Sequence, residues 1–419
     1  MLKGPIILGT IRTSFVLGLR LIVQAGTLFL LATALGPDGF GLYAALGAMA
    51  VLLGTLSNFG THLTLLRDVA RASPDVDAAL RLALGTTAFC GSALLLIYVV
   101  LSQVLLPIPN GAHWVVLFLG IAEVVLQPFL VVAAMERHGR GQIARSQVLL
   151  MQPLLLRLLV ILAIAAFAPD NPLSWYALGH LCAVTLPLGY VVWSAAPLTW
   201  REPGQWRVAR RSDWRGLAGY AVMNASANGV AELDKMLAAR LLPFGAAGVY
   251  SAASRVVGSL VLPVMAMVLA AMPRLFRDGA AAGKTLHYWL FAFAAAYGLL
   301  AAAVMLLAAP WIETLLGDAY AGVSELIQLL AFAIPAVGVR AAATNILTTL
   351  ERPWLRVCLE LIGWLVIVAL ALVFVRTHES LGLALSIICA EWLLAVGSVV
   401  LISMITAPSR KSIDWDTLK

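Results

Sequence analysis

The hydrophobic residues of this chain form long blocks separated by short polar connections. A membrane's hydrocarbon core, roughly 30 Å thick, is crossed by an α-helix of about 20 apolar residues. Each block is long enough for this, so each predicts one membrane-spanning helix. We draw twelve blocks, near residues 6–35, 42–66, 80–106, 113–135, 147–168, 174–196, 214–241, 246–272, 285–309, 325–349, 354–376 and 381–406.

Composition supports the same interpretation. Hydrophobic residues make up 62% of the chain and charged residues only 12%, against roughly 45–50% and 25% in soluble domains. The four cysteines lie far apart inside apolar blocks, without the close pairs typical of metal or redox sites. The first block is longer than the apolar part of a cleavable signal peptide, so we expect a permanent helix. The chain is predicted to be an all-α polytopic membrane protein without a metal or cofactor.

Basic residues predict the orientation of the helices. Of the 28 lysines and arginines, 21 fall in one alternating set of loops and chain ends, whereas the other set carries only Arg240 and Arg376. Lysine and arginine resist translocation, so the basic side is expected to be cytoplasmic. Both termini are therefore predicted to lie in the cytoplasm.

The chain also repeats itself. The segment Gly41-Leu42-Tyr43-Ala44-Ala45 recurs 207 residues later as Gly248-Val249-Tyr250-Ser251-Ala252, and the same offset relates Arg67 to Arg274. Six blocks separate equivalent points, so both halves enter the membrane in the same orientation. This predicts two parallel six-helix lobes related by an axis along the membrane normal. The expected parts are an N-terminal lobe (1–200), a cytoplasmic linker (201–213), a C-terminal lobe (214–410) and a cytoplasmic tail (411–419).

Charged residues inside the blocks are the candidates for function. A central Arg, Lys or Asp costs roughly 2.5–3.5 kcal/mol on insertion scales, so its helix should face protein or water. Arg20 is the clearest case, because at about 100° per residue it shares one face of block one with Thr13, Gln24 and Thr27. Two interpretations stay open: a cation in the wall of an aqueous cavity, or an interhelical pair with a carboxylate.

Blocks seven and eight carry further polar stripes. Asn224, Asn228, Glu232 and Lys235 share a face of block seven, with Asp234 to one side. In block eight, Ser251, Arg255 and Ser259 follow at four-residue intervals. These stripes fit a cavity or a structural role equally well, and Lys235 and Arg255 could also snorkel toward the membrane surface.

Acidic residues next to bases suggest ion coupling. A buried acid beside a base can be poised to change protonation, which makes Asp234 and Glu232 the first candidates and Glu123 the next. A scattered group of opposite charges in neighbouring blocks predicts buried ion pairs within a lobe; it comprises Glu123, Arg157, Arg340, Glu360 and Glu391.

Turn motifs give the chain a family resemblance. Residues 34–43 (ALGPDGFGLY), Asn58-Phe59-Gly60 and Arg67-Asp68-Val69-Ala70-Arg71 resemble the Wzx-type polysaccharide flippases. A comparable turn spans Leu242 to Tyr250, with Pro243 where the first copy has Gly36. These flippases belong to the MOP (multidrug/oligosaccharidyl-lipid/polysaccharide) exporter superfamily, together with MATE drug exporters and lipid II flippases.

The resemblance implies a V-shaped, MATE-like architecture in which helices 1, 2, 7 and 8 line a central lumen. It implies transfer of undecaprenyl-diphosphate-linked sugar repeat units to the periplasmic side of a bacterial inner membrane, coupled to H⁺ or Na⁺. Polymerase and chain-length machinery of the same pathway would be partners, and nucleic acid would not. Guanidinium groups offer bidentate donors to a diphosphate. The predicted substrate-binding residues are Arg20, Gln24, Thr27, Asn224, Asn228, Lys235 and Arg255.

Two alternatives remain. A MATE-like antiporter of small-molecule cations would share the architecture, but it should line its lumen with acids. An enzyme of the same pathway would usually need a large external loop to hold acceptor sugars, and the longest external loop here spans only residues 310–324. A transporter rather than an enzyme is therefore expected.

Overall fold

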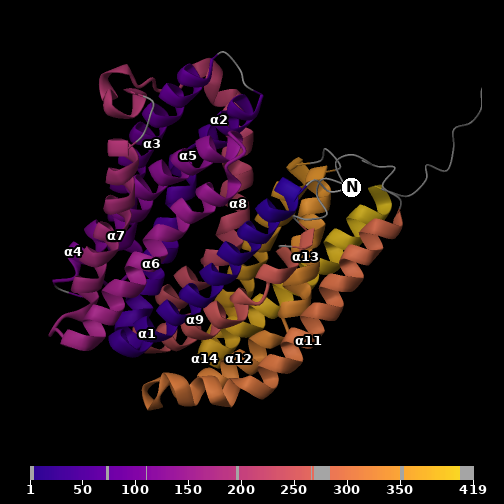
Figure 1. The fold of residues 1–419 in the computed structure, drawn as a ribbon. Coiled ribbons are helices and arrows are strands. Elements are labelled where there is room, and N and C mark those ends of the chain that lie inside the picture. The colour runs from indigo at the N-terminus through magenta and orange to yellow at the C-terminus, as the bar shows by residue number, and fades with distance from the viewer. Residues whose placement is uncertain are drawn as a thin grey trace, which may run out of the picture.

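The computed structural model describes residues 4–71, 75–109, 111–194, 198–265, 267–268, 284–349 and 353–405. Across these ranges the chain is helical and contains no strand, as Figure 1 shows. The fold class predicted from the hydrophobic pattern is confirmed.

The N-terminal half is a bundle of long apolar helices. Its fourth predicted block is one continuous helical stretch in which a π-helical turn, η1, separates two α-helices. The elements are α1 (Gly4–Ser57), α2 (Thr61–Ala70), α3 (Val76–Leu105), α4 (His113–Gly120), η1 (Ile121–Leu126), α5 (Gln127–Gly139), α6 (Ile143–Phe167) and α7 (Pro172–Ser194).

Two short 3-10 turns, η2 (Leu198–Arg201) and η3 (Pro203–Gln205), lead into the C-terminal half. This half again consists of helices, with one further 3-10 turn. The elements are α8 (Arg211–Leu241), α9 (Phe244–Ser259), α11 (Lys284–Leu316), η5 (Asp318–Tyr320), α12 (Val323–Ala331), α13 (Ile334–Thr349) and α14 (Pro353–Ile405).

Two of the helices are broken inside their span. In α1 the break lies at Gly36, where φ is 64° and ψ is 174°, a conformation that is essentially restricted to glycine. Pro37 follows and further disfavours a helical Gly36. In α14 the break lies at Glu379, with φ of 48°. Each of these helices therefore covers two of the predicted blocks.

Eight of the described helices are long and apolar enough to cross a membrane, or nine when the bent pair α12–α13 is taken as one span. The chain is thus a multi-pass membrane protein. Helix α8 is not among them, because the polar stripe predicted for block seven lowers its hydropathy. The total of twelve helices stays a prediction.

The two halves form two lobes that meet near the crossing of α1 and α9 and diverge toward the end that holds α2 (Figure 1). At the crossing, a Cβ atom added to Gly41 would lie 2.2 Å from the carbonyl oxygen of Phe244. A Cβ atom added to Gly248 would lie 1.9 Å from the carbonyl oxygen of Pro37. Phe244 and Pro37 are themselves 207 residues apart, the same offset that separates Gly248 from Gly41. The two contacts are therefore equivalent, with the two repeats in exchanged roles, as expected when a two-fold axis relates the repeats.

The predicted linker is held against the N-terminal lobe. Its Trp206 ring packs on Phe129, with 5.6 Å between ring centroids. The backbone N–H of Arg207 donates to the carbonyl oxygen of Arg81 at 3.0 Å. At the start of α8, the Asp213 carboxylate accepts the backbone N–H of Arg210 at 2.9 Å, and this bond lowers the pKa of Asp213. The linker therefore fixes the position at which α8 begins next to the N-terminal lobe. The exact lobe boundaries stay predictions, and residues 411–419 lie outside the described residues.

Candidate transport site

Arg20 is a partly buried cation on α1. Among the residues that the structure describes, it has no hydrogen-bond or ion-pair partner. Gln24, one turn further along α1, is exposed. A Cβ atom added to Gly18 or Gly26 would meet no atom within 4 Å, so this part of α1 borders open space. The interhelical ion pair weighed from the sequence does not form in this conformation, whereas a position facing water or ligand is compatible with it.

The other residues of the α1 stripe differ from Arg20. Thr27 is buried, and its hydroxyl donates to the carbonyl oxygen of Val23 at 2.7 Å, inside the same helix. Its contact with substrate stays a prediction. The side chain of Thr13 lies outside the part of the chain whose side chains are described.

Asp234 is the centre of a polar cluster between α8 and α9. Lys235 donates to it at 2.9 Å and also lies 3.9 Å from Glu232. Two hydroxyl groups of α9 donate to the same carboxylate, from Tyr250 at 3.2 Å and from Ser254 at 2.5 Å. Both Asp234 and Lys235 are buried. The cluster holds two acids for one base, which leaves an excess of negative charge.

The two hydroxyl partners were not predicted from the sequence. The polar stripe predicted for this helix holds Ser251, Arg255 and Ser259, whereas Tyr250 and Ser254 lie on the adjacent face of α9. Their four-residue spacing is a signal that they share a helix face, but it does not say which face meets α8. Ser251 is buried, and its hydroxyl has no partner among the described atoms.

Arg255, like Arg20, is a candidate cation without a partner among the described residues. The structure describes no ion pair or hydrogen bond for it, and its Nε atom is buried. It lies within electrostatic reach of Tyr176 on α7, which belongs to the other lobe. Arg255 therefore places an uncompensated positive charge where the two lobes approach each other.

Helix α8 contacts both lobes within half a turn. The side-chain amide of Asn224 donates to the carbonyl oxygen of Thr55 on α1 at 3.5 Å, a long hydrogen bond. Two residues later, the hydroxyl of Ser226 donates to Glu360 on α14. The side chain of Asn228 lies outside the described residues. The contact of Asn224 is the weaker of the two and is the one that a movement between the lobes would change.

Glu123 lies in the π-helical turn η1 and is buried. It accepts hydrogen bonds from Arg157 at 2.6 Å and from His180 at 2.8 Å. Tyr176 packs on His180, with 6.1 Å between ring centroids. The predicted Glu123–Arg157 pair is confirmed, whereas His180 was not singled out. A role for Glu123 in ion coupling stays a prediction.

In the C-terminal lobe the predicted pairing is confirmed for Arg340 and Glu391, whereas Glu360 pairs with a base that was not predicted. Arg340 binds Glu391 through two bonds, of 2.5 and 3.0 Å. Glu360 pairs with Arg356 at 3.1 Å, one turn away on α14. All three acids of the predicted structural group therefore form ion pairs with bases. Arg20 and Arg255, in contrast, form no ion pair with an acid in the described part of the chain.

Comparison with known proteins identifies the family. A family model described as "Polysaccharide biosynthesis protein" matches residues 7–277, more than half of the chain. The chain belongs to this family. The structural relatives described below are named as transporters or as a flippase. No curated protein sequence matches the chain.

Solved structures with the same fold are members of the MOP superfamily. The inward-facing conformation of a multidrug resistance MATE family transporter matches with a TM-score of 0.73 at 12% identity, over 92% of this chain and 94% of that one. The outward-facing conformation of such a transporter matches with a TM-score of 0.65 at 13% identity, over 94% and 95%. The lipid II flippase MurJ in an inward closed conformation matches with a TM-score of 0.73 at 11% identity, over 94% and 87%. The resemblance to this superfamily is confirmed, and the fold is more similar to the inward-facing form.

Proposed function

We propose that this polysaccharide biosynthesis family member is a flippase for undecaprenyl-diphosphate-linked sugar repeat units. It moves them by alternating access from the cytoplasmic to the periplasmic leaflet of a bacterial inner membrane, with both termini in the cytoplasm. The observation that carries the proposal is Arg20, a partly buried cation that has no partner in the described part of the chain. A charge at membrane depth is costly, so an unpaired one indicates a functional ligand.

The charge of the cargo explains the choice. A diphosphate is a multiply charged anion, and guanidinium binds phosphate oxygens with bidentate geometry. Arg20 on α1 and Arg255 on α9 are the two candidates that keep their donors free of protein acids. Lys235 contributes less, because Asp234 already neutralises it.

The rival proposal is a MATE-like antiporter of organic cations. The shared fold does not separate the two functions, because both occur in this superfamily. The free charges separate the two functions: Arg20 and Arg255 have no acid partner in the described part of the chain, whereas Glu123, Glu360 and Glu391 are paired with bases. The remaining acidic charge, in the Asp234 cluster, we assign to the coupling ion. We therefore prefer an anionic, lipid-linked cargo.

Energy coupling is proposed for the cluster around Asp234. Two acids share one base there, so one negative charge is left to bind a proton or Na⁺. Occupancy that differs between the inward and outward states would couple the ion gradient to transport.

The test is deletion of the gene followed by analysis of polyprenyl-diphosphate-linked glycans in each leaflet. Loss of a flippase should make a lipid-linked glycan accumulate on the cytoplasmic face, and the intact gene should reverse this. If export of glycans is unchanged and the cells instead become sensitive to organic cations, the antiporter is correct. Complementation with Arg20→Ala then tests whether this residue carries the activity.

A further inference from the structure

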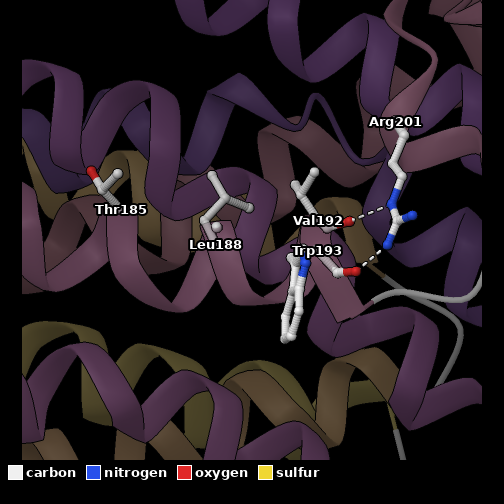
Figure 2. Close-up of a pocket in the computed structure, with 6 residues that line it drawn as sticks. Thr185, Leu188, Val192, Trp193 and Arg201 are labelled. Atoms are coloured by element: carbon white, nitrogen blue, oxygen red, sulfur yellow. Dashed lines mark hydrogen bonds between the residues drawn. The ribbon is translucent and has the colours of Figure 1, made fainter.

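The outer surface of α7 has a groove that the transport site does not use. Its volume is about 580 Å³, and it is lined by Thr185, Leu188, Gly189, Val192, Trp193 and Arg201. Except for Arg201, these residues are spaced at three- and four-residue intervals along α7, as expected for one side of a helix. Figure 2 shows Thr185, Leu188, Val192 and Trp193 in this order along the helix. From Thr185 to Trp193 the groove extends over about 12 Å of helix.

The groove is apolar along its length and cationic at one end. Arg201 donates from Nε to the carbonyl oxygen of Val192 at 3.0 Å, and from a terminal nitrogen to that of Trp193 (Figure 2). A guanidinium group has more N–H donors than these two bonds use. Arg201 is exposed, so its remaining donors are accessible to an external acceptor.

The surroundings place this end at a membrane interface. Trp193 is 76% exposed and Tyr190 is 57% exposed, and such aromatic side chains concentrate at the level of lipid headgroups. Toward the middle of α7, Leu186 is 62% exposed, as expected for a helix that faces lipid. The linker that contains Arg201 also carries Arg207, Arg210 and Arg211, so the local charge is positive.

We propose that this groove binds an anionic glycerophospholipid of the surrounding membrane. The phosphate group would accept hydrogen bonds from Arg201, and one acyl chain would lie along Thr185, Leu188, Gly189 and Val192. Basic pockets at the cytoplasmic ends of membrane helices bind anionic headgroups by this charge complementarity. The lipid would hold the linker end of α7 at the membrane surface. This site is separate from the transport site and does not depend on the nature of the cargo.

Gly189 makes the groove testable. A Cβ atom at this position would meet no atom within 4 Å, so a phenylalanine ring can enter the groove without disturbing the packing of α7. Gly397 on α14 is an exposed glycine with the same open surroundings that does not line this groove, and it provides the matched control. For Arg201, the control is Arg376, an exposed arginine in α14.

The experiment measures the Tm of the purified full-length protein in detergent with phosphatidylglycerol or phosphatidylcholine of identical acyl chains. Phosphatidylglycerol should raise the Tm of the wild type by about 3 °C or more above phosphatidylcholine. Arg201→Gln and Gly189→Phe should each abolish this difference, whereas Arg376→Gln and Gly397→Phe should keep it. Arg201→Lys should retain most of it, because the charge remains.

Four results would overturn the proposal. The wild type could fail to distinguish the two lipids, or Gly189→Phe could keep the full difference, which would mean that no acyl chain occupies the groove. Inorganic phosphate added with phosphatidylcholine could reproduce the effect, which would show that a free anion suffices. If Arg201 serves only to cap the C-terminal carbonyls of α7, Arg201→Gln lowers the Tm equally in both lipids and leaves the difference intact.

Discussion

Gly41 of α1 and Gly248 of α9 face each other across the junction of the two lobes. A Cβ atom on Gly41 would lie 2.9 Å from the backbone nitrogen of Gly248, and one on Gly248 would lie 3.1 Å from the nitrogen of Gly41. Each glycine also lies against a backbone carbonyl of the opposite repeat. The residues that reveal the duplication in the sequence are thus the ones that let the two repeats touch.

This contact predicts that side chains are not tolerated there. Gly41→Ala and Gly248→Ala should each destabilise the protein by about 1–3 kcal/mol, because the added methyl group meets rigid backbone. The two effects should be similar in size, and the double variant should cost less than their sum, since one separation of the helices relieves both clashes. Thermal unfolding of the purified variants measures this. Gly47→Ala on the same helix, which meets open space, is the control; equal behaviour of Gly41→Ala and Gly47→Ala would contradict the prediction.

Features of the fold and the site that depend on residue spacing or on charge burial could be predicted from the sequence, whereas features that depend on how two helices are rotated against each other could not. The Glu123–Arg157 pair could be predicted, because the cost of charge in a membrane favours pairing between neighbouring helices, whereas the substrate role of the polar stripe around Arg20 stays a prediction. The Tyr250 and Ser254 bonds to Asp234 could not, because they depend on how α9 is rotated against α8. The pairing of Glu360 with Arg356 was also missed, since Arg356 was not among the charges singled out inside the apolar blocks. The turns between blocks one and two and between blocks eleven and twelve were expected as loops. Each is reduced to a single non-helical residue, Gly36 in α1 and Glu379 in α14, so one helix covers both blocks.

The Glu123–Arg157 pair predicts a loss of stability when one partner is removed. Glu123→Gln should leave Arg157 without its carboxylate and destabilise the protein by about 3–5 kcal/mol, the usual cost of breaking a buried pair. Replacing both residues, as in Glu123→Leu with Arg157→Met, should recover much of the loss, because no charge is then left buried. Expression level and Tm are the readouts. A double variant that is as unstable as the single one would show that His180 and Glu123 contribute independently of Arg157.

Removing the charge of the Asp234 cluster should change how transport depends on the ion gradient. Asp234→Asn keeps the acceptor oxygen for the hydroxyls of Tyr250 and Ser254 but removes the charge that a proton or Na⁺ would bind. Transport should therefore lose its dependence on the ion gradient, with Glu232→Gln giving a smaller effect. Ser254→Ala serves as a control, since it removes one hydrogen bond and leaves the charge. Unchanged gradient dependence in both acid variants would refute the assignment.

The orientation of the helices predicts the result of reporter fusions. A reporter fused after Asp170, before α7, should lie on the periplasmic side, whereas one fused after Gly204, in the linker, should lie in the cytoplasm. The single span of α7 separates the two positions. Alkaline phosphatase and fluorescent protein fusions give opposite signals on the two sides. The same signal at both positions would show that the positive-inside assignment fails in this lobe.

Arg20 gives the most direct test of the transport site. Arg20→Ala should abolish glycan export while the protein still inserts and accumulates, because in the described structure Arg20 has no partner whose loss would destabilise the fold. Arg20→Lys should retain partial export, since an ammonium group keeps the charge but lacks bidentate geometry. Export is measured by surface glycan in a deletion strain, and abundance is measured in isolated membranes.

The control and the contrary outcome follow from the same geometry. Arg376→Ala removes an exposed arginine in α14 and should leave both export and abundance unchanged. If Arg20→Ala instead mainly lowers abundance, and a second substitution at an acid such as Glu123 restores it, then Arg20 forms an ion pair in another conformation. Because Glu123 is already bound by Arg157 and His180 here, such an exchange would require the N-terminal lobe to rearrange during the transport cycle. We expect instead that the guanidinium group stays free until a diphosphate enters, and that no substitution of an acid rescues Arg20→Ala.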